Sequence, residues 1–433
     1  MVLQRNSEVA VWGWGDAGST LKVTGSWNAG DTVAAKVANN GKWITKIKTG
    51  EGGGPYTLSV IGRNTVNVNN VLLGEVWICS GQSNMEWSID SKVTNGEAEA
   101  AMANYPNIRF FDVPRMGADY PQEDCKASWT VCNPKSVRTP SAVGYFFARE
   151  IHKNLNVPVA IITSAWGGSP AEVWVREENI ANDPILRENA YSEKVDWWPG
   201  KPGTTYNGMI APLKPYGIAG VLWYQGESNV GTAKTYSHLM ETLIKQWRKD
   251  FGKEFPFYYV QIAPYAYQIG SKSQLLREQQ TKLASMVPNT GMVVISDLVD
   301  NIKDIHPQNK LDVGRRLANL ALAETYGKKL LPYKSPMYKS MTVEKGKVIL
   351  VFDNAPNGFS AKNKVITGFK IAGEDKKFVD ATAQIKGNTI VVSSPNVKIP
   401  TAVRFGFDDT SIPDVFSKDG LPVAPFRTDN WEE

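Results

Sequence analysis

The sequence predicts an α/β protein with a central parallel sheet covered by helices and a β-rich region on either side. Between about residue 71 and residue 330, short apolar strands alternate with amphipathic helices, as in a parallel sheet covered on both faces. Residues 1–70 and 331–433 instead alternate apolar and polar residues between turn sequences. We therefore expect three domains: a β-sandwich over 1–70, an α/β domain over 71–330 and a β-rich domain over 331–433.

Individual elements follow from the same patterns. The expected strands of the central region are 75–79, 159–162, 220–224, 257–261 and 292–295, and its expected helices are 143–153, 236–249 and 310–325. The expected strands outside it are 9–14, 20–24, 56–60, 348–352 and 389–392. Functional residues of such sheets gather just past the carboxyl ends of the strands.

Composition excludes several classes of protein. Hydrophobic residues make up 42% and charged residues 21% of the 433 residues, which is typical of a folded chain. The net charge of +5 is spread without a basic block, so we expect no nucleic-acid partner. No apolar run is long enough to span a bilayer. Cys125 and Cys132 are close enough in sequence to form a local disulfide, whereas Cys79 is expected to be a buried free thiol.

Ser83 follows the strand 75–79 in the turn Ser-Gly-Gln-Ser-Asn-Met. A serine on a glycine-containing turn from strand to helix is presented at the sheet edge, where its own N–H can stabilise an oxyanion. The alternative is a helix N-cap, a position that serine often takes. The turn is not Gly-x-Ser-x-Gly, which disfavours the nucleophile elbow of α/β-hydrolases.

A histidine near the end of another strand supplies a candidate base. Of the three histidines, His152 and His238 fall inside expected helices, and only His306 lies in a loop past a strand end. Imidazole titrates near neutrality, as a serine esterase requires of its base. Asp304 can hold that imidazole in the productive tautomer, and Asp297 and Asp300 in the same loop are alternatives.

Two further turns lie past strand ends. Gly168, in Trp-Gly-Gly-Ser-Pro after strand 159–162, is a candidate second oxyanion donor, although a plain tight turn is an equal alternative. Gln225 and Glu227 follow strand 220–224 and supply hydrogen-bond donors and acceptors at the same edge of the sheet, although this motif taken alone favours a plain polar turn.

These motifs together resemble the sialate O-acetylesterase family of the SGNH hydrolases. The resemblance rests on residues 74–87, 166–172, 206–213, 224–229 and 304–307, and it covers nearly the whole chain. It implies a flavodoxin-like hydrolase core over 71–330, with Ser83 as nucleophile and His306 as base. It also implies hydrolysis of acetyl esters on carbohydrates without a cofactor or metal, in a protein that is secreted or periplasmic.

The sequence departs from the family pattern at two points. Many SGNH enzymes place the acid three residues before the histidine, where this chain has Lys303. The usual Gly-x-Asn-Asp block is replaced by Gln225-Gly226-Glu227-Ser228. The acid is therefore open between Asp304 and its neighbours, and the oxyanion partner is open between Gln225 and Glu227.

The resemblance leaves the sugar open between acetylated sialic acid and acetylated hemicellulose such as xylan or xyloglucan. A sialate enzyme needs a cation for the sugar carboxylate, for which Arg176 is the candidate, although a structural ion pair is the commoner role of such an arginine. A hemicellulose esterase relies on stacking by tryptophans near the motifs: Trp87, Trp166 and Trp174. Gln82 and Asn207, inside the matching motifs, are further candidate substrate contacts.

A non-catalytic carbohydrate-binding protein with a decayed esterase core is the alternative function. The presence of Ser83, Asp304 and His306 together argues against it.

Overall fold

The computed structural model describes residues 1–28, 30–190, 200–268 and 270–432, and the chain divides into two compact units. The first unit comprises Met1–Trp223 and Thr242–Phe257, and the second comprises Tyr224–Glu241 and Tyr258–Glu433. Within the described residues, no helix is both long and apolar enough to cross a membrane.

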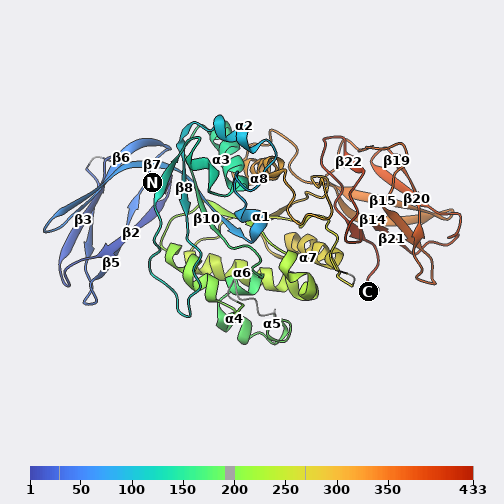
Figure 1. Cartoon of the computed structure of the whole chain (residues 1–433), viewed down its shortest axis with the longest axis horizontal. Helices are drawn as coiled ribbons and strands as arrows, with labels where there is room; N and C mark the ends of the chain where they lie inside the picture. Colours follow the sequence, from blue (N-terminus) through green and yellow to red (C-terminus); the bar gives the residue numbers. More distant parts are fainter. Residues whose placement is uncertain (29, 191–199, 269, 433) are drawn as a thin grey trace. The chain divides into compact units, whose positions relative to one another are not determined.

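The first unit begins with two small sheets whose facing apolar side chains make a core (Figure 1). One sheet pairs β2 with β5, and the other joins β3, β4 and β6 to the start of β7. Val9, Trp43 and Leu58 are buried between them. The strands are β1 (Val2–Gln4), β2 (Glu8–Trp14), β3 (Thr20–Gly25), β4 (Thr32–Lys36), β5 (Lys42–Lys48), β6 (Gly53–Ile61) and β7 (Thr65–Gly81).

Strand β7 is 17 residues long and takes part in both the first β-region and the central sheet. Its first six residues are exposed, and every residue from Val71 to Gly81 is buried. The sequence pattern changes from alternating to continuously apolar near residue 71, so it predicts two environments. In the structure, the single strand β7 passes through both environments. Its first part pairs with β6, and its later part pairs with β10. The division into three domains stays a prediction.

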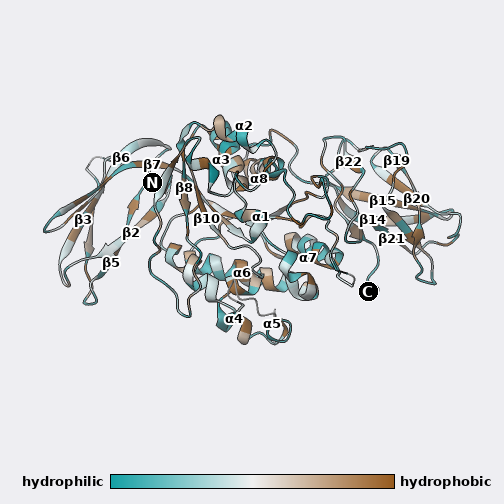
Figure 2. Ribbon diagram, viewed as in Figure 1, coloured by the Kyte–Doolittle hydropathy of each residue, from teal (hydrophilic) through white to brown (hydrophobic). Residues whose placement is uncertain are grey.

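The central sheet of the first unit runs in the order β11, β7, β10, β8, β9. β10 (Val159–Ala165) pairs in parallel with β7 and with β8 (Tyr105–Asp112), whereas β9 (Trp129–Cys132) is antiparallel to β8. β10 is buried throughout, and brown hydrophobic residues run along it in Figure 2. β11 spans Gly220–Tyr224. These parallel pairs confirm the α/β core.

Helix α3 (Ala142–Leu155) packs closely on this sheet. A Cβ at Gly144 would lie only 2.8 Å from Ile161 of β10 and 3.0 Å from Cys79 of β7, so glycine permits the close approach. The Phe147 ring meets Trp77 edge-on at 5.0 Å between centroids. Buried aromatic and small residues together fix the helix against β7, the strand that ends two residues before Ser83.

The other helical segments of the first unit are short, apart from α6. They are α1 (Ser83–Glu86), α2 (Gly96–Ala101), η1 (Ser136–Arg138), η2 (Ala171–Trp174), α4 (Glu177–Ala181), α5 (Pro184–Glu188), η3 (Tyr206–Ile210), η4 (Ala211–Leu213) and α6 (Tyr236–Phe251), of which the part from Thr242 belongs here.

The second unit contains two longer helices and a pair of neighbouring strands. β12 (Phe257–Val260) lies beside β13 (Thr290–Val293). η5 (Glu227–Thr235) follows β11, and α7 (Ser273–Met286) packs on it. α8 (Lys310–Glu324) begins directly after the loop that carries His306.

Short antiparallel strands form the end of the second unit, drawn in red in Figure 1. Their core contains stacked rings, with Tyr338 and Phe426 4.9 Å apart at an interplanar angle of 6°. The strands are β14 (Met337–Glu344), β15 (Lys347–Asp353), β16 (Phe359–Ala361), β17 (Phe369–Ala372), β18 (Val379–Asp380), β19 (Thr382–Lys386), β20 (Thr389–Ser393), β21 (Ala402–Phe405), β22 (Val415–Ser417) and β23 (Phe426–Arg427).

The disulfide that the sequence left open is not formed. Cys125 and Cys132 are free thiols, as is Cys79, which is fully buried as predicted. Cys132 is buried at the end of β9, whereas Cys125 lies half-buried in the preceding loop. The six residues between the two cysteines permitted a bridge, but the pairing of β9 with β8 places Cys132 inside.

Candidate active site

Ser83 is the first residue of α1, directly after the buried end of β7. Gln82, not Ser83, occupies the N-cap position, so the serine is not the cap that its residue type suggested. Gln82 and Asn84 are buried, and Ser83 is half-buried between them. The Trp87 N–H donates to the Ser83 carbonyl at 2.8 Å, which closes the single helical turn.

The turn Trp166–Ser169 lies against Ser83. It leaves the end of β10, where the Trp166 N–H donates to the Gly81 carbonyl at 3.0 Å. A Cβ at Gly167 would be 3.3 Å from the Ser83 Cβ, closer than most side chains approach. Gly168 has φ +76°, a value that favours glycine. Residues 166–169 therefore form a tight turn, and the Gly168 N–H, the candidate oxyanion donor, lies within it.

Glu86 joins the serine turn to the glycine turn. Its Oε2 accepts the Gly167 N–H at 2.9 Å, and its Oε1 accepts the Arg115 Nε–H at 2.6 Å. That hydrogen bond to the carboxylate raises the pKa of Arg115. Sequence reasoning gave Glu86 no role. Its position three residues after Ser83, one helical turn on, was the available signal.

In the second unit, Gln225 is fully buried and holds a polar turn together. Its Nε2 donates to Asn229 Oδ1 at 2.8 Å, and the Tyr236 hydroxyl donates to its Oε1 at 2.8 Å. The backbone of Gly226 has φ +156°, and a Cβ there would lie 2.7 Å from Ile262. Both the nitrogen and the oxygen of the Gln225 side-chain amide thus form hydrogen bonds that stabilise this turn.

His306 lies in the loop between β13 and α8 with Asp304 beside it. Asp304 Oδ1 accepts the His306 backbone N–H at 2.9 Å and lies 3.6 Å from His306 Nδ1. Burial lowers the pKa of His306, the charge of Lys310 lowers it further, and the charge of Asp304 opposes both. The imidazole is therefore held toward its neutral form, in which one ring nitrogen can accept a proton.

The alternative acids have different surroundings. Asp297 forms a two-point ion pair with Arg316, with Oδ1 2.6 Å from Nη1 and Oδ2 2.6 Å from Nη2. Asp300 is exposed. Of the three carboxylates that the sequence left open, Asp304 is the one with a recorded contact to His306.

A buried lysine stands next to this loop. Lys310, the first residue of α8, is fully buried, and its Nζ lies 5.3 Å from the centroid of the Tyr224 ring. Burial lowers its pKa to about 7, although the charges of Glu227 and Asp304 favour its protonated form. Glu227, itself buried, is thus an electrostatic partner of Lys310. The position of Lys310 at the start of an expected helix gave no reason to expect burial.

The protein-family comparison matches residues 73–323 to the model for carbohydrate esterases described as sialic acid-specific acetylesterases. The human sialate O-acetylesterase is 31% identical over 379 residues, covering 78% of this chain and 71% of the human protein.

The chain belongs to this carbohydrate acetylesterase family.

Other members extend the match to the whole chain. The mouse sialate O-acetylesterase is 27% identical over an alignment of 500 positions that covers 98% of this chain and 92% of the mouse protein. The crystal structure of a carbohydrate acetylesterase from Xanthomonas citri is 36% identical with a TM-score of 0.90, covering 99% of this chain and 97% of that one. The expected family and SGNH-type fold are confirmed, and carbohydrate acetylesterase activity is supported.

Arg176 of this carbohydrate esterase is held in an ion pair. Its guanidinium pairs with Asp250, its Nε–H donates to the Tyr206 hydroxyl at 3.2 Å, and Tyr206 in turn donates to Asp250 at 2.5 Å. This arrangement favours the structural role that the sequence left open. Asn207 likewise has a structural contact, donating to the Ala118 carbonyl at 3.1 Å.

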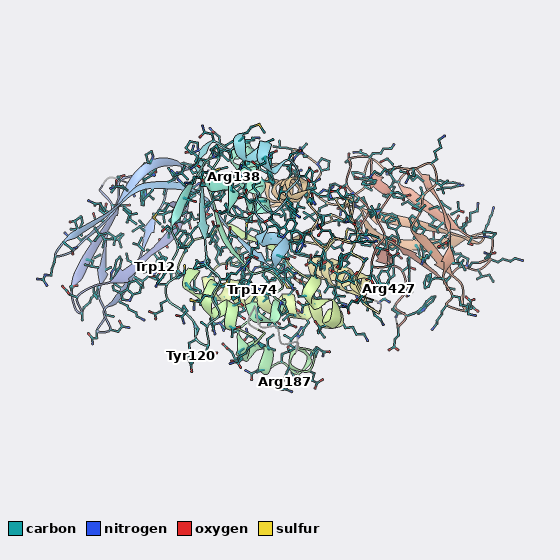
Figure 3. All side chains as sticks on the ribbon, in the orientation of Figure 1. Trp12, Tyr120, Arg138, Trp174, Arg187 and Arg427 are labelled. Carbon is teal, nitrogen blue, oxygen red and sulfur yellow. The ribbon has the colours of Figure 1, made fainter. Side chains whose placement is uncertain are left out.

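The tryptophans of the esterase motifs divide into two kinds. Trp174, labelled in Figure 3, is fully buried, donates to Ser169 Oγ at 2.9 Å and meets Trp223 edge-on. It is therefore a core residue, and the expectation that it stacks on sugar is wrong. Trp87 and Trp166 are half-buried, and each is joined by a backbone hydrogen bond to a residue of the segment Gly81–Ser83.

Within the described residues, no three or more His, Cys, Asp or Glu side chains are grouped so as to hold a metal ion.

Proposed function

We propose that this chain is a serine esterase in which Ser83 is the acyl-accepting nucleophile and His306 is the general base. The observation that carries the proposal is the close packing of the Gly167–Gly168 turn on Ser83. A peptide N–H beside a nucleophilic serine can stabilise the oxyanion of acyl transfer. The Gly168 N–H and the Ser83 N–H are the proposed donors.

The reaction has two acyl-transfer steps. His306 takes the proton from the Ser83 hydroxyl as Oγ bonds to the acetyl carbonyl carbon. The oxyanion collapses, the ester bond breaks, and His306 returns the proton to the departing sugar hydroxyl. Water then attacks the acetyl-serine in the same way and releases acetate.

Asp304 is proposed to orient His306. Its Oδ1 already accepts the His306 backbone N–H, and the same oxygen lies near Nδ1. A carboxylate there favours the tautomer whose Nε2 is free of a proton and stabilises the imidazolium that forms.

We propose an acetylated neutral polysaccharide of the hemicellulose type as the substrate. Two arguments support it. Arg176, the cation that a sialate carboxylate would need, is engaged with Asp250. Trp87 and Trp166 are half-buried next to the ends of β7 and β10, and such rings provide stacking surfaces for uncharged pyranoses. We also propose that the protein is exported to the polymers it acts on.

Acetylated sialic acid is the second candidate, favoured by the names of the human and mouse relatives. Acetate release from acetylated xylan, xyloglucan, mannan and O-acetylated sialic acid distinguishes the two. We expect kcat/KM to be at least about tenfold higher on one of the neutral polymers than on the sialic acid, a difference of about 1.4 kcal/mol in transition-state binding. Faster release from the sialic acid would overturn the proposed substrate but not the esterase mechanism.

A carbohydrate-binding protein without catalysis is distinguished by covalent labelling. A fluorophosphonate probe should modify wild-type protein at Ser83 and leave Ser83→Ala unmodified. A wild-type chain that binds acetylated polymers but neither labels nor releases acetate would contradict the esterase proposal.

A further inference from the structure

The turn beside Ser83 has two possible backbone arrangements. In Trp166–Ser169, the Ser169 N–H donates to the Trp166 carbonyl at 3.2 Å, so Gly167 and Gly168 are the central residues of a β-turn. Type I and type II turns differ by a rotation of the central peptide, and a positive φ at the third residue is the mark of type II. The φ of +76° at Gly168 assigns type II here.

The rotating peptide is the one that carries the Gly168 N–H, the proposed oxyanion donor. Because glycine occupies both central positions, the sequence of the turn opposes neither arrangement. A change from type II to type I would turn that N–H by roughly 180°. A contact from outside the turn can therefore decide between the two arrangements.

Glu86 contacts the turn at Gly167, the residue just before the peptide that would rotate. Its Oε2 accepts the Gly167 N–H at 2.9 Å, and a Cβ at Gly167 would lie 3.1 Å from the same oxygen. Hydrogen bonds from a backbone N–H to a carboxylate are stronger than those to a neutral acceptor. Gly167 is thus held between the Glu86 carboxylate and Ser83.

Arg115 fixes the carboxylate from its other side. Its Nε–H donates to Glu86 Oε1 at 2.6 Å, so the two oxygens of Glu86 have separate partners. Arg115 lies in the loop after β8, which is tied to neighbouring segments by the bonds Val113 N–H to Thr163 carbonyl, at 2.9 Å, and Ala118 N–H to Thr204 carbonyl, at 3.0 Å. The Glu86 side chain is only 24% exposed, which limits competition from water.

We propose that Glu86, held by Arg115, is a positioning residue that keeps the Gly167–Gly168 peptide in the arrangement needed for oxyanion stabilisation. The inference rests on the proposed function of Ser83. Glu86 does not contact the reacting atoms in this account, and it acts through the backbone of the glycine turn.

The test compares Glu86→Ala, Glu86→Gln and wild type on p-nitrophenyl acetate, with enzyme concentration set by fluorophosphonate titration of reactive serine. We expect kcat per titrated site to fall about 10²-fold in Glu86→Ala, comparable to the loss of one oxyanion donor, with KM changed less than about threefold. The rate constant of fluorophosphonate labelling should fall in parallel, because the tetrahedral adduct uses the same donors. Glu86→Gln keeps an acceptor oxygen and should recover at least about tenfold of the loss.

Glu99→Gln is the matched control. Glu99 also pairs with an arginine, Arg149, and both side chains are largely buried. This variant should lower the melting temperature without changing kcat per titrated site.

Three results would overturn the inference. One is a Glu86→Ala enzyme whose kcat per site is within about threefold of wild type. Another is a loss that appears only as fewer titratable sites, which indicates a purely structural role. The third is a Ser83→Ala enzyme that keeps its turnover, which would remove the proposed function as well, whereas the first two leave that function standing.

Discussion

The segment around Ser83 and the segment around His306 are held by different kinds of interaction. Ser83 follows a buried strand, and its surroundings are set by backbone hydrogen bonds and by glycines that allow close packing. His306 lies in a loop, and the ionisable side chains of Asp304 and Lys310 shift the pKa of its imidazole. Close backbone packing thus shapes the surroundings of the proposed nucleophile, whereas charged neighbours shift the pKa of the proposed base.

This difference has a consequence for mutation. A conservative change near Ser83 acts through shape, because a Cβ at Gly167 or Gly144 would meet atoms at 3.3 Å or less. A conservative change near His306 acts through the pKa of the imidazole, because each neighbour there contributes charge.

The largest expected effect is on the two reacting groups. Ser83→Ala and His306→Ala should each lower kcat on p-nitrophenyl acetate by about 10⁴-fold or more, because each removes a group on which the same step depends. The double variant should be no slower than about threefold below either single variant. Steady-state kinetics measure the rates, and thermal unfolding should show that each variant folds. Losses that multiply in the double variant would mean that the two residues do not serve one step.

Asp304→Asn should lower kcat by about 10²- to 10³-fold, since the amide loses the charge that stabilises the imidazolium. The expected change in melting temperature is small, because the Asp304 side chain is 40% exposed.

Asp297→Asn is the matched comparison in the same loop. Removing one partner of this largely buried pair with Arg316 should cost about 1–3 kcal/mol of unfolding free energy, while kcat per folded molecule changes little. If Asp297→Asn instead loses activity at full stability and Asp304→Asn stays active, the acid is Asp297.

A smaller effect is expected on the pH profile when Lys310 is replaced. The charge of Lys310 lowers the pKa of His306, so Lys310→Met should raise that pKa. Because the neutral imidazole is the base, the acid limb of kcat/KM should then move to higher pH. Lys303→Met, an exposed lysine of the same loop, is the control and should leave the limb in place. A limb that moves to lower pH, or equally in both variants, would contradict the electrostatic account.

The sequence predicted the strands and helices well where their pattern was regular. The strand predicted at 220–224 is β11, and the helix predicted at 310–325 is α8, Lys310–Glu324. The domain boundary expected at residue 70 falls inside the continuous strand β7. A change of hydrophobic pattern indicates a change of environment, and one strand can continue through that change. Ser83, Asp304 and His306 were identified because each lies in a short motif past a strand end.

Other features depend on residues far apart in the sequence. The pairing of Arg176 with Asp250, the burial of Trp174 against Trp223 and the bond from Arg115 to Glu86 join segments that no local pattern connects. The burial of Lys310 near Glu227 is of the same kind, because a lysine at the start of a helix is ordinarily exposed.

The sequence by itself determined the family, the α/β core and the motif that contains Ser83, because local hydrophobic periodicity and short turn motifs encode these. Only the tertiary structure decided which carboxylate neighbours His306, that Arg176 pairs with Asp250, and that Glu86 accepts the Gly167 N–H. Those outcomes depend on hydrogen bonds and charges that form only when distant segments pack, and their strength depends on burial that the folded chain creates.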